Sequence, residues 1–316
     1  MTKKNLRLLY GVLFSMILSL SSCSSDDSTS SEDIPLSADI FQSTVGKKVA
    51  FQGLTNKATS WLWDFGDGTT SSEKNPVHVF AEGGYYTAKL TATAADGSSV
   101  SREIDLAVDL TPYILLTGGP TATNGKTWRI ANAHSAGDYF ANADASLSPF
   151  AGAPNPLPGG ILGAGLGLGE VYQDEYTFHF NGDYSMDLKD GAAFSGLVYQ
   201  FLTTGGVGIK NPSSDQDFGL CTGFYTPEPN ATFTYVENTD LTVSSVYGPG
   251  FALTYNGVST LSFSGTMFFG MIDYERKVII KEVKDNTLKA IMFISASPDY
   301  APLNTHALVL TFEAVK

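Results

Sequence analysis

The sequence contains almost no cysteine. Its 316 residues include only Cys23 and Cys221, too few to build a framework of disulfide bonds. If Cys23 is modified, as its surroundings indicate, Cys221 has no partner within the chain. Stability must then come from hydrophobic cores, and we expect Cys221 to be a small buried apolar residue.

Positive charge is also scarce. Nineteen Lys and Arg stand against 32 Asp and Glu, which gives a formal net charge of −13. An acidic chain repels nucleic acid and anionic lipid headgroups, and it disfavours anionic polysaccharides. Neutral ligands are unaffected by this argument.

The residue patterns of common catalytic and metal sites are missing as well. The sequence has no Gly-x-Ser-x-Gly elbow, Walker loop or dinucleotide fingerprint in its proper context. We therefore predict no catalytic residues, no metal centre and no cofactor. A surface calcium site stays open among aspartates whose spacing is not that of an EF-hand. The four scattered histidines and these aspartates are His78, His134, His179, His306, Asp183, Asp187, Asp190, Asp215 and Asp217.

The N-terminus has the layout of a secretory signal. Lys3, Lys4 and Arg7 precede an apolar run from Leu8 to Leu20, which is too short to span a bilayer comfortably. The run Leu20-Ser21-Ser22-Cys23 resembles the bacterial lipobox, in which the cysteine is lipidated and becomes the first residue. This resemblance implies a signal peptide over residues 1–22 and a lipid, such as palmitate, on Cys23. The alternative is an ordinary signal peptide with an incidental cysteine.

A polar tether is expected over residues 23–36. It is rich in Ser, Asp and Thr and cannot bury enough apolar surface to offset its ordering entropy. Ser24-Ser25-Asp26-Asp27 resembles, loosely, the acidic export signal of Bacteroidetes surface lipoproteins, although it can also be a solvated linker. Loss of residues 1–22 removes three positive charges and no acid, and the net charge moves from −13 to −16.

Residues 37–108 predict a small β domain. Trp61, Trp63 and Phe65 alternate at period two, and glycines and aspartates that favour a tight turn follow them. The run Trp63-Asp64-Phe65-Gly66-Asp67-Gly68, with His78 and Tyr86 further on, resembles the PKD domain, an immunoglobulin-like β-sandwich. The resemblance implies that Trp63, Asp64, Phe65, Gly66, Asp67, Gly68 and His78 build the fold, and that the domain acts as a spacer or adhesion module.

Residues 109–124 are rich in Gly and Pro and predict a linker, and residues 125–316 predict a second β domain. The turn Asn181-Gly182 between two alternating runs is a strong hairpin signal. We expect an all-β protein in which a PKD sandwich precedes a larger, jelly-roll-like β-sandwich. An apolar, Gly- and Pro-rich insertion over residues 144–169 either packs on one edge or contacts a partner or glycan.

The start of the second domain resembles a module of Bacteroidetes surface lipoproteins from polysaccharide-utilisation systems. The runs that carry the resemblance are Gly125-Lys126-Thr127-Trp128, residues 134–140 and residues 172–178. Glycan binding needs flat rings and a few polar groups, and both are found in the loops here. The preferred glycan-binding candidates are Asp138, Tyr139, Phe140, Phe150, Tyr172, Asp174, Tyr199, Tyr225 and Tyr247, and Phe251 and Tyr300 belong to the same aromatic group.

Together these features predict a non-catalytic lipoprotein, anchored by its lipid in the outer membrane and facing the cell exterior. It would capture a polysaccharide, such as a laminarin-like β-glucan, for an outer-membrane importer complex. Two alternatives stand beside this prediction. One is a surface glycoside hydrolase or lyase that uses acids such as Asp174 and Glu175. The other is a structural or adhesion lipoprotein without a sugar site.

Overall fold

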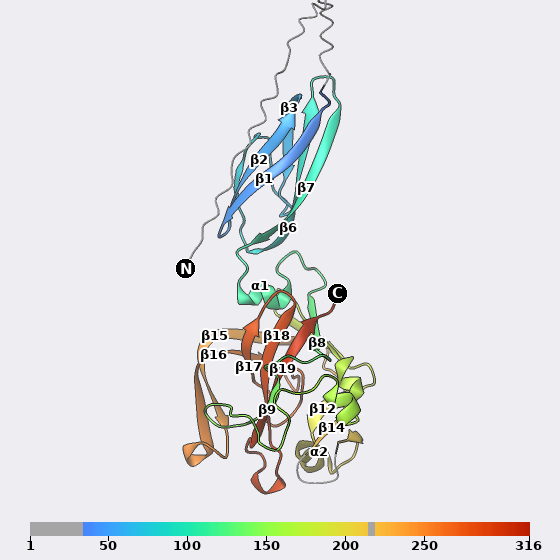
Figure 1. Cartoon of the computed structure of the whole chain (residues 1–316), viewed down its shortest axis with the longest axis vertical. Coiled ribbons are helices and arrows are strands. Elements are labelled where there is room, and N and C mark those ends of the chain that lie inside the picture. The colour runs from blue at the N-terminus through green and yellow to red at the C-terminus, as the bar shows by residue number, and fades with distance from the viewer. Residues whose placement is uncertain (1–33, 214–218) are drawn as a thin grey trace, which may run out of the picture. The chain divides into compact units, whose positions relative to one another are not determined.

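The computed structural model describes residues 34–213 and 219–316 (Figure 1). The predicted signal peptide, the lipidation site Cys23, most of the tether and the aspartates Asp215 and Asp217 lie outside the described residues. Within them, no helix is long and apolar enough to cross a membrane.

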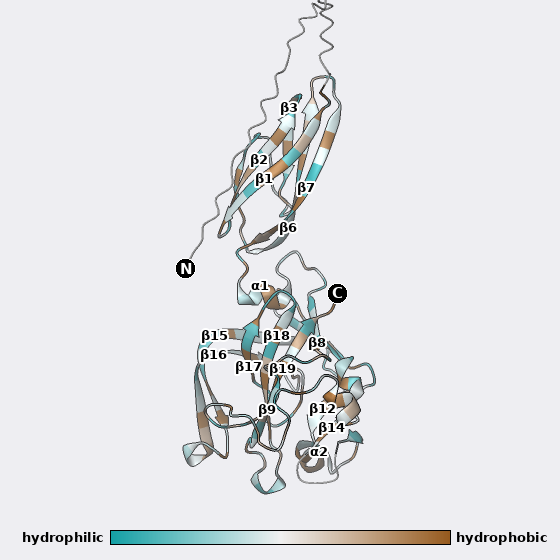
Figure 2. Ribbon diagram, in the orientation of Figure 1, coloured by the Kyte–Doolittle hydropathy of each residue, from teal (hydrophilic) through white to brown (hydrophobic). Residues whose placement is uncertain are grey.

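The first domain is a sandwich of two antiparallel sheets. One sheet has the order β1-β2-β5 and the other the order β4-β3-β6-β7. Buried and exposed side chains alternate along these strands, as the period-two pattern of the sequence requires, and the hydropathy changes with them (Figure 2). The strands are β1 Ser37–Val45, β2 Lys48–Asn56, β3 Ala58–Asp64, β4 Thr70–Ser71, β5 Val77–Val79, β6 Gly84–Ala94 and β7 Ser99–Val108.

The core of this sandwich is built from the motif that the sequence singled out. Trp63 and Phe65 are buried, and the ring of His78 stacks on Phe65 with the ring centroids 4.2 Å apart. Asp64 and Asp67 accept hydrogen bonds from the backbone N–H groups of Gly66 and Thr69, which closes the turn. Gly66 has a φ of 78°, and a Cβ there would lie 2.6 Å from the carbonyl oxygen of Thr87, so only glycine fits.

In the second domain, eight of the described strands form a closed ring. Each pairs antiparallel with the next along the chain, and the last, β19, pairs with both β18 and β8. The all-β prediction is confirmed, but a meander that closes on itself is not a jelly roll. The tight turn Asn181-Gly182 joins β10 to β11, whereas long segments join β8 to β10 and β11 to β15, and in each case strands consecutive in the ring are neighbours in space. The strands are β8 Lys126–Ile130, β10 Glu175–Phe178, β11 Asp183–Asp187, β15 Ala231–Ser244, β16 Ala252–Phe263, β17 Val278–Val283, β18 Thr287–Ile294 and β19 His306–Ala314.

Aromatic side chains fill the interior of the ring. The loop between β16 and β17 contributes Phe268 and Phe269, and Phe269 stacks on Phe312 with the ring centroids 4.2 Å apart. The hydroxyl of Tyr176 donates to the carbonyl oxygen of Gly270 at 3.1 Å, and that of Tyr184 donates to the carbonyl oxygen of Phe268 at 2.6 Å. The ring therefore encloses a packed core, and the interaction surfaces must lie elsewhere.

A second core lies on the outer face of the ring. The far half of the β15–β16 hairpin bends over β17, β18 and β19, where Leu241 and Val243 join a cluster with Ile291 and Phe293. Register shifts between Val236 and Leu241 mark the bend. The hairpin tip then meets the β18–β19 connection, because the backbone N–H of Val246 donates to the carbonyl oxygen of Asn304 at 3.2 Å. This contact positions the candidate site.

Smaller elements complete the domain. Helix α1 (Pro112–Thr117) lies in the predicted linker, yet its Leu116 belongs to the core of the second domain. Strand β9 (Tyr139–Asn142) extends the sheet beside β19, and helix α2 (Leu197–Thr204) follows the first strand of a small separate sheet. That sheet consists of β12 Ala192–Gly196, β13 Ile209–Pro212 and β14 Leu220–Phe224, and the one-turn segments are η1 Ile161–Gly165, η2 Gly169–Tyr172, η3 Pro249–Phe251 and η4 Pro298–Tyr300.

Candidate functional site

Three exposed aromatic side chains line one cleft at the end of the second domain. Tyr247 and Phe251 come from the tip of the β15–β16 hairpin, and Tyr300 comes from the β18–β19 connection. They are 49%, 57% and 53% exposed, whereas most other aromatic side chains of this domain are buried or half-buried. The cleft has a volume of about 450 Å³, and its remaining lining residues are Val246, Ala296, Ser297, Thr305 and His306.

Short turns hold these rings at the surface. Pro249 and Pro298 open the one-turn helices η3 and η4, where their fixed φ favours the first helical position. The backbone N–H of Tyr247 donates to Oγ of Ser245, and its hydroxyl donates to Oδ1 of Asn142 at 3.2 Å. Backbone geometry and hydrogen bonds, rather than burial, therefore position the rings.

The cleft presents no formal charge at neutral pH. Its single titratable side chain other than tyrosine is His306, and burial lowers the pKa of that imidazole to about 4. Nδ1 of His306 lies 2.9 Å from Oγ1 of Thr305, and Phe150 packs edge-on against the imidazole with the centroids 4.7 Å apart. The imidazole therefore acts as a neutral polar group in the wall of the cleft.

A second, apolar pocket adjoins the cleft. It has a volume of about 230 Å³ and shares Ala296 and His306 with the cleft. The insertion over residues 144–169 contributes part of its wall, while Leu157, Leu162 and Leu168 of the same insertion belong to the main core. The insertion therefore packs against the core, and the same segment lines a surface pocket. The apolar side chains of the pocket are Phe140, Ala153, Pro154, Ile161, Leu166, Leu220 and Ile294.

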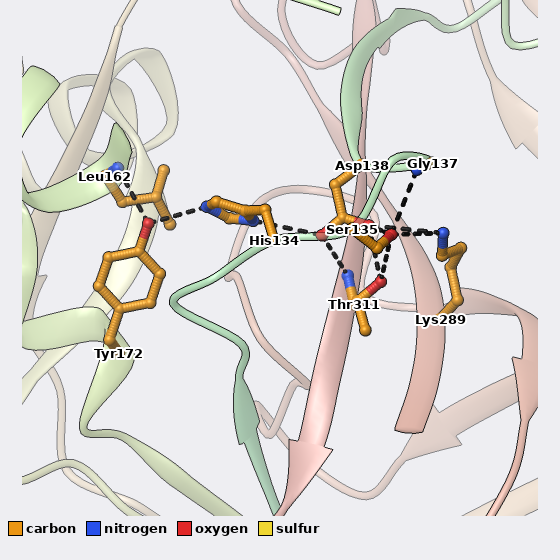
Figure 3. A network of polar contacts seen from close by, with 8 residues as sticks. All are labelled: His134, Ser135, Gly137, Asp138, Leu162, Tyr172, Lys289 and Thr311. Atoms are coloured by element: carbon orange, nitrogen blue, oxygen red, sulfur yellow. Dashed lines mark hydrogen bonds and ion pairs between the residues drawn. The ribbon is translucent and has the colours of Figure 1, made fainter. Parts of the chain in front are cut away.

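Figure 3 shows a network of polar contacts in the second domain, and none of its residues lines the cleft or the apolar pocket. Nδ1 of His134 lies 3.2 Å from Oδ2 of Asp138, and Nε2 lies 2.8 Å from the hydroxyl oxygen of Tyr172. That hydroxyl accepts the backbone N–H of Leu162 at 3.1 Å. The hydroxyl then donates to Nε2, and Nδ1–H donates to the carboxylate. The network joins the insertion to the β8–β9 loop.

Asp138 is the centre of that network. Its oxygens accept hydrogen bonds from the hydroxyls of Ser135 and Thr311 and from the backbone N–H of Thr311, and Lys289 Nζ lies 3.5 Å away. Burial on its own would raise the pKa of Asp138, but the hydrogen bonds from His134, Ser135 and Thr311 outweigh it and hold the pKa well below its usual range. All of these bonds are internal, so the carboxylate serves the fold.

Two other buried acids each keep one oxygen without a hydrogen-bond partner among the described residues. Asp174 accepts a bond from the backbone N–H of Lys189, and burial raises its pKa to about 8. Asp273 accepts bonds from the backbone N–H groups of Tyr274 and Ser295, and burial raises its pKa to about 7. Neither acid lines the cleft.

The structure separates the predicted glycan-binding residues. Tyr247 lines the cleft, Phe140 lines the adjoining pocket, and Phe150 contacts His306. Asp138, Tyr172 and Asp174 are buried and are not brought to the cleft. Tyr139 is half-buried against the second core, Tyr199 packs edge-on against Tyr274, and the hydroxyl of Tyr225 is hydrogen-bonded to Thr266.

Phe251 and Tyr300 belong to the wider aromatic group rather than to the preferred set, and no sequence pattern connects His306 with a glycan site. A local sequence pattern does mark Phe251 and Tyr300. Gly248-Pro249-Gly250-Phe251 and Ser297-Pro298-Asp299-Tyr300 each place an aromatic residue directly after a proline turn. In the described part of the chain, no group of three or more His, Cys, Asp or Glu side chains could hold a metal ion.

Comparisons with known proteins identify the first domain. The family model described as the PKD domain matches residues 38–108. Collagenase ColA of Bacillus cereus is 45% identical over 56 residues, which cover 18% of this chain and 6% of the collagenase. The crystal structure of the PKD1 domain from the Vibrio cholerae metalloprotease PrtV is 31% identical and covers 24% of this chain and all of that chain, with a TM-score of 0.24.

One solved structure matches most of the chain. It is titled for the promiscuous specificity of carbohydrate-binding modules from the β-sandwich superfamily, and it covers 90% of this chain and 94% of its own. The identity is 12% and the TM-score 0.25, too low to carry an argument about ligand or fold. What the comparisons establish is local: residues 38–108 are a PKD domain.

Proposed function

We propose that this protein is a non-catalytic glycan-binding protein whose aromatic cleft stacks on a neutral polysaccharide. The observation that carries the proposal is the set of three exposed rings, Tyr247, Phe251 and Tyr300, in one uncharged cleft. Aromatic rings of this kind match the apolar faces of pyranose rings, while the hydroxyl of Ser297 in the cleft wall can hydrogen-bond a sugar hydroxyl. The acidic net charge of the chain favours a neutral polymer over an anionic one.

In this proposal the N-terminal region and the PKD domain present the cleft. Cys23 carries the lipid, the polar tether and the PKD domain hold the second domain away from the outer membrane, and an importer complex receives the glycan. A laminarin-like β-glucan is the first glycan to test, because the start of the second domain resembles modules of polysaccharide-utilisation lipoproteins and such a glucan is neutral.

Affinity electrophoresis of the purified protein tests the glycan site. We expect retarded migration in a gel that contains laminarin or another neutral glucan, and no retardation with an anionic polysaccharide. A variant with Tyr247→Ala, Phe251→Ala and Tyr300→Ala together should migrate as it does in an empty gel. Phe201→Ala with Phe224→Ala is the matched control, because it removes two exposed rings outside the cleft. Unretarded migration of the native protein with every polysaccharide would refute the glycan site.

The absence of catalysis and the lipid anchor need separate measurements. Incubation with each retarding polysaccharide should release no reducing sugar, whereas release that disappears in Asp174→Asn would favour the hydrolase alternative. Cells that express the native chain should incorporate labelled palmitate into the protein, and Cys23→Ala should abolish the label. Equal labelling of both chains would remove Cys23 as the anchor.

A further inference from the structure

The apolar pocket beside the cleft has the size and lining of a binding site for one apolar group. We call it the apolar annex and define it by Phe140, Ala153, Ile161, Leu166, Leu220 and Ile294. A cavity of about 150 Å³ lined by Leu, Ile and Phe is enough to bind benzene. The annex, at about 230 Å³, has room for one aromatic ring or a short acyl chain.

The lining of the annex favours an apolar occupant. Leu220 and Ile294 are buried, and the partly buried side chains of Phe140, Ile161 and Leu166 pack against the same core. Such walls offer water few hydrogen-bond partners, so an apolar group gains free energy by entering. The imidazole of His306, neutral at physiological pH, adds no charge that such a group would have to desolvate.

The geometry also links the annex to the sugar site. Ala296 and His306 line both the annex and the aromatic cleft, so one molecule can occupy both. The cleft presents exposed rings suited to pyranose faces, and the annex presents mostly apolar walls suited to an apolar group. A plain glycan would leave the annex unused.

We propose that the ligand is a glycan or glycoside that carries an apolar substituent, such as an aryl group or a short acyl ester, with the sugar in the cleft and the substituent in the annex. This inference rests on the proposed function and narrows its substrate class. The insertion over residues 144–169, which forms one wall of the annex, then contributes to ligand specificity.

A pair of small glycosides tests the proposal on the purified full chain. Methyl and phenyl β-D-glucopyranoside present the same sugar and differ only in the apolar group. Titration followed by NMR should show that the phenyl glucoside binds about tenfold or more tightly, which is the gain expected for removing an aryl group from water. Equal affinities for the two glucosides, or no detectable binding of either glucoside, would overturn the proposal.

A substitution that fills the annex with a larger side chain tests where the phenyl group binds. Ala153→Phe should lower the affinity of the protein for phenyl glucoside to its affinity for methyl glucoside. Ala151→Phe is the matched control, because Ala151 is exposed in the same loop and does not line the annex. Thermal unfolding of both variants checks that they fold. A phenyl advantage that persists in folded Ala153→Phe would place the ring elsewhere and overturn the assignment.

A further measurement keeps the two hypotheses distinguishable. Phenol alone should bind the native protein and compete with phenyl glucoside but should not alter migration in polysaccharide gels. If the gels show glycan binding and neither phenol nor phenyl glucoside enters the annex, this inference fails and the proposed function stands. If phenol binds and no polysaccharide retards the protein, the proposed function fails, and the annex is a site for an apolar ligand of another class.

Discussion

The second domain contains two sets of side chains that look alike in the sequence but have opposite roles in the structure. The buried network combines His134, Tyr172 and Asp138, and the exposed cleft combines His306, Tyr247 and Tyr300. In the network the hydrogen bonds run to other protein groups, and the side chain of Asp138 is fully buried. In the cleft the side chains of Tyr247 and Tyr300 are about half exposed to solvent. Residue type alone therefore does not separate a structural histidine–tyrosine pair from a binding surface.

The largest expected effect is on the network. Asp138→Ala should destabilise the protein by about 3–5 kcal/mol, because it leaves His134 and Thr311 without their buried acceptor. Chemical denaturation measures the change, with the exposed acid in Glu237→Ala as the control. Native-like stability of Asp138→Ala would show that the network contributes little to the free energy of unfolding. It would also contradict the structural role that distinguishes the network from the cleft.

Asp273 differs from Asp138 in that one of its oxygens has no hydrogen-bond partner among the described residues. Burial raises the pKa of Asp273 to about 7 from its ordinary value of 3.8, so the folded state binds the proton more tightly than the unfolded state. The contribution of Asp273 to stability is therefore lost as the pH rises from about 4 through 7.

We therefore expect Asp273→Asn to be more stable than the native protein at pH 8 by roughly 2–4 kcal/mol and to match it near pH 4. Thermal or denaturant unfolding at the two pH values measures this difference. Asp299→Asn, at an exposed acid, should show no such pH dependence. A native-like pH profile for Asp273→Asn would mean that the carboxylate is compensated in the folded protein.

In the cleft, substitution should change binding rather than stability. Tyr300→Ala should weaken glycan binding about tenfold or more, since it removes one stacking ring, and should change the free energy of unfolding by less than about 0.5 kcal/mol. Calorimetric titration with an oligosaccharide that the gels identify, together with denaturation, tests both halves. A large loss of stability without a specific loss of binding would give Tyr300 a structural role and remove the contrast.

The smallest expected effect is that of pH on binding. Because burial lowers the pKa of His306 to about 4, the imidazole stays neutral between pH 6 and pH 8. Glycan affinity should be constant over that range and should fall only as the pH approaches 4, where a proton adds a charge to the cleft wall. Affinity that changes around pH 6.5 would indicate an ordinary, solvated imidazole.

Much of the architecture followed from local patterns. Period-two alternation and turn residues predicted the strands of both domains, and the run Trp63-Asp64-Phe65-Gly66-Asp67-Gly68 predicted the PKD domain. The jelly-roll topology was wrong, because alternation reports which face of a strand is buried but not which strand lies beside it. Closure of the ring depends on the pairing of β19 with β8, whose residues lie more than 170 positions apart.

The sequence by itself determined the all-β fold class of the protein, its PKD domain, its acidic charge and the set of candidate aromatic residues in loops. These properties depend on composition and on neighbours within a few residues. Only the tertiary structure decided which aromatic residues form a surface. Tyr247 and Tyr300 lie on different connections, and they line one cleft because the bent β15–β16 hairpin meets the β18–β19 connection at Asn304. The same long-range packing buries Asp138 and Tyr172, since burial is set by all the elements that pack around a residue and not by its neighbours in the chain.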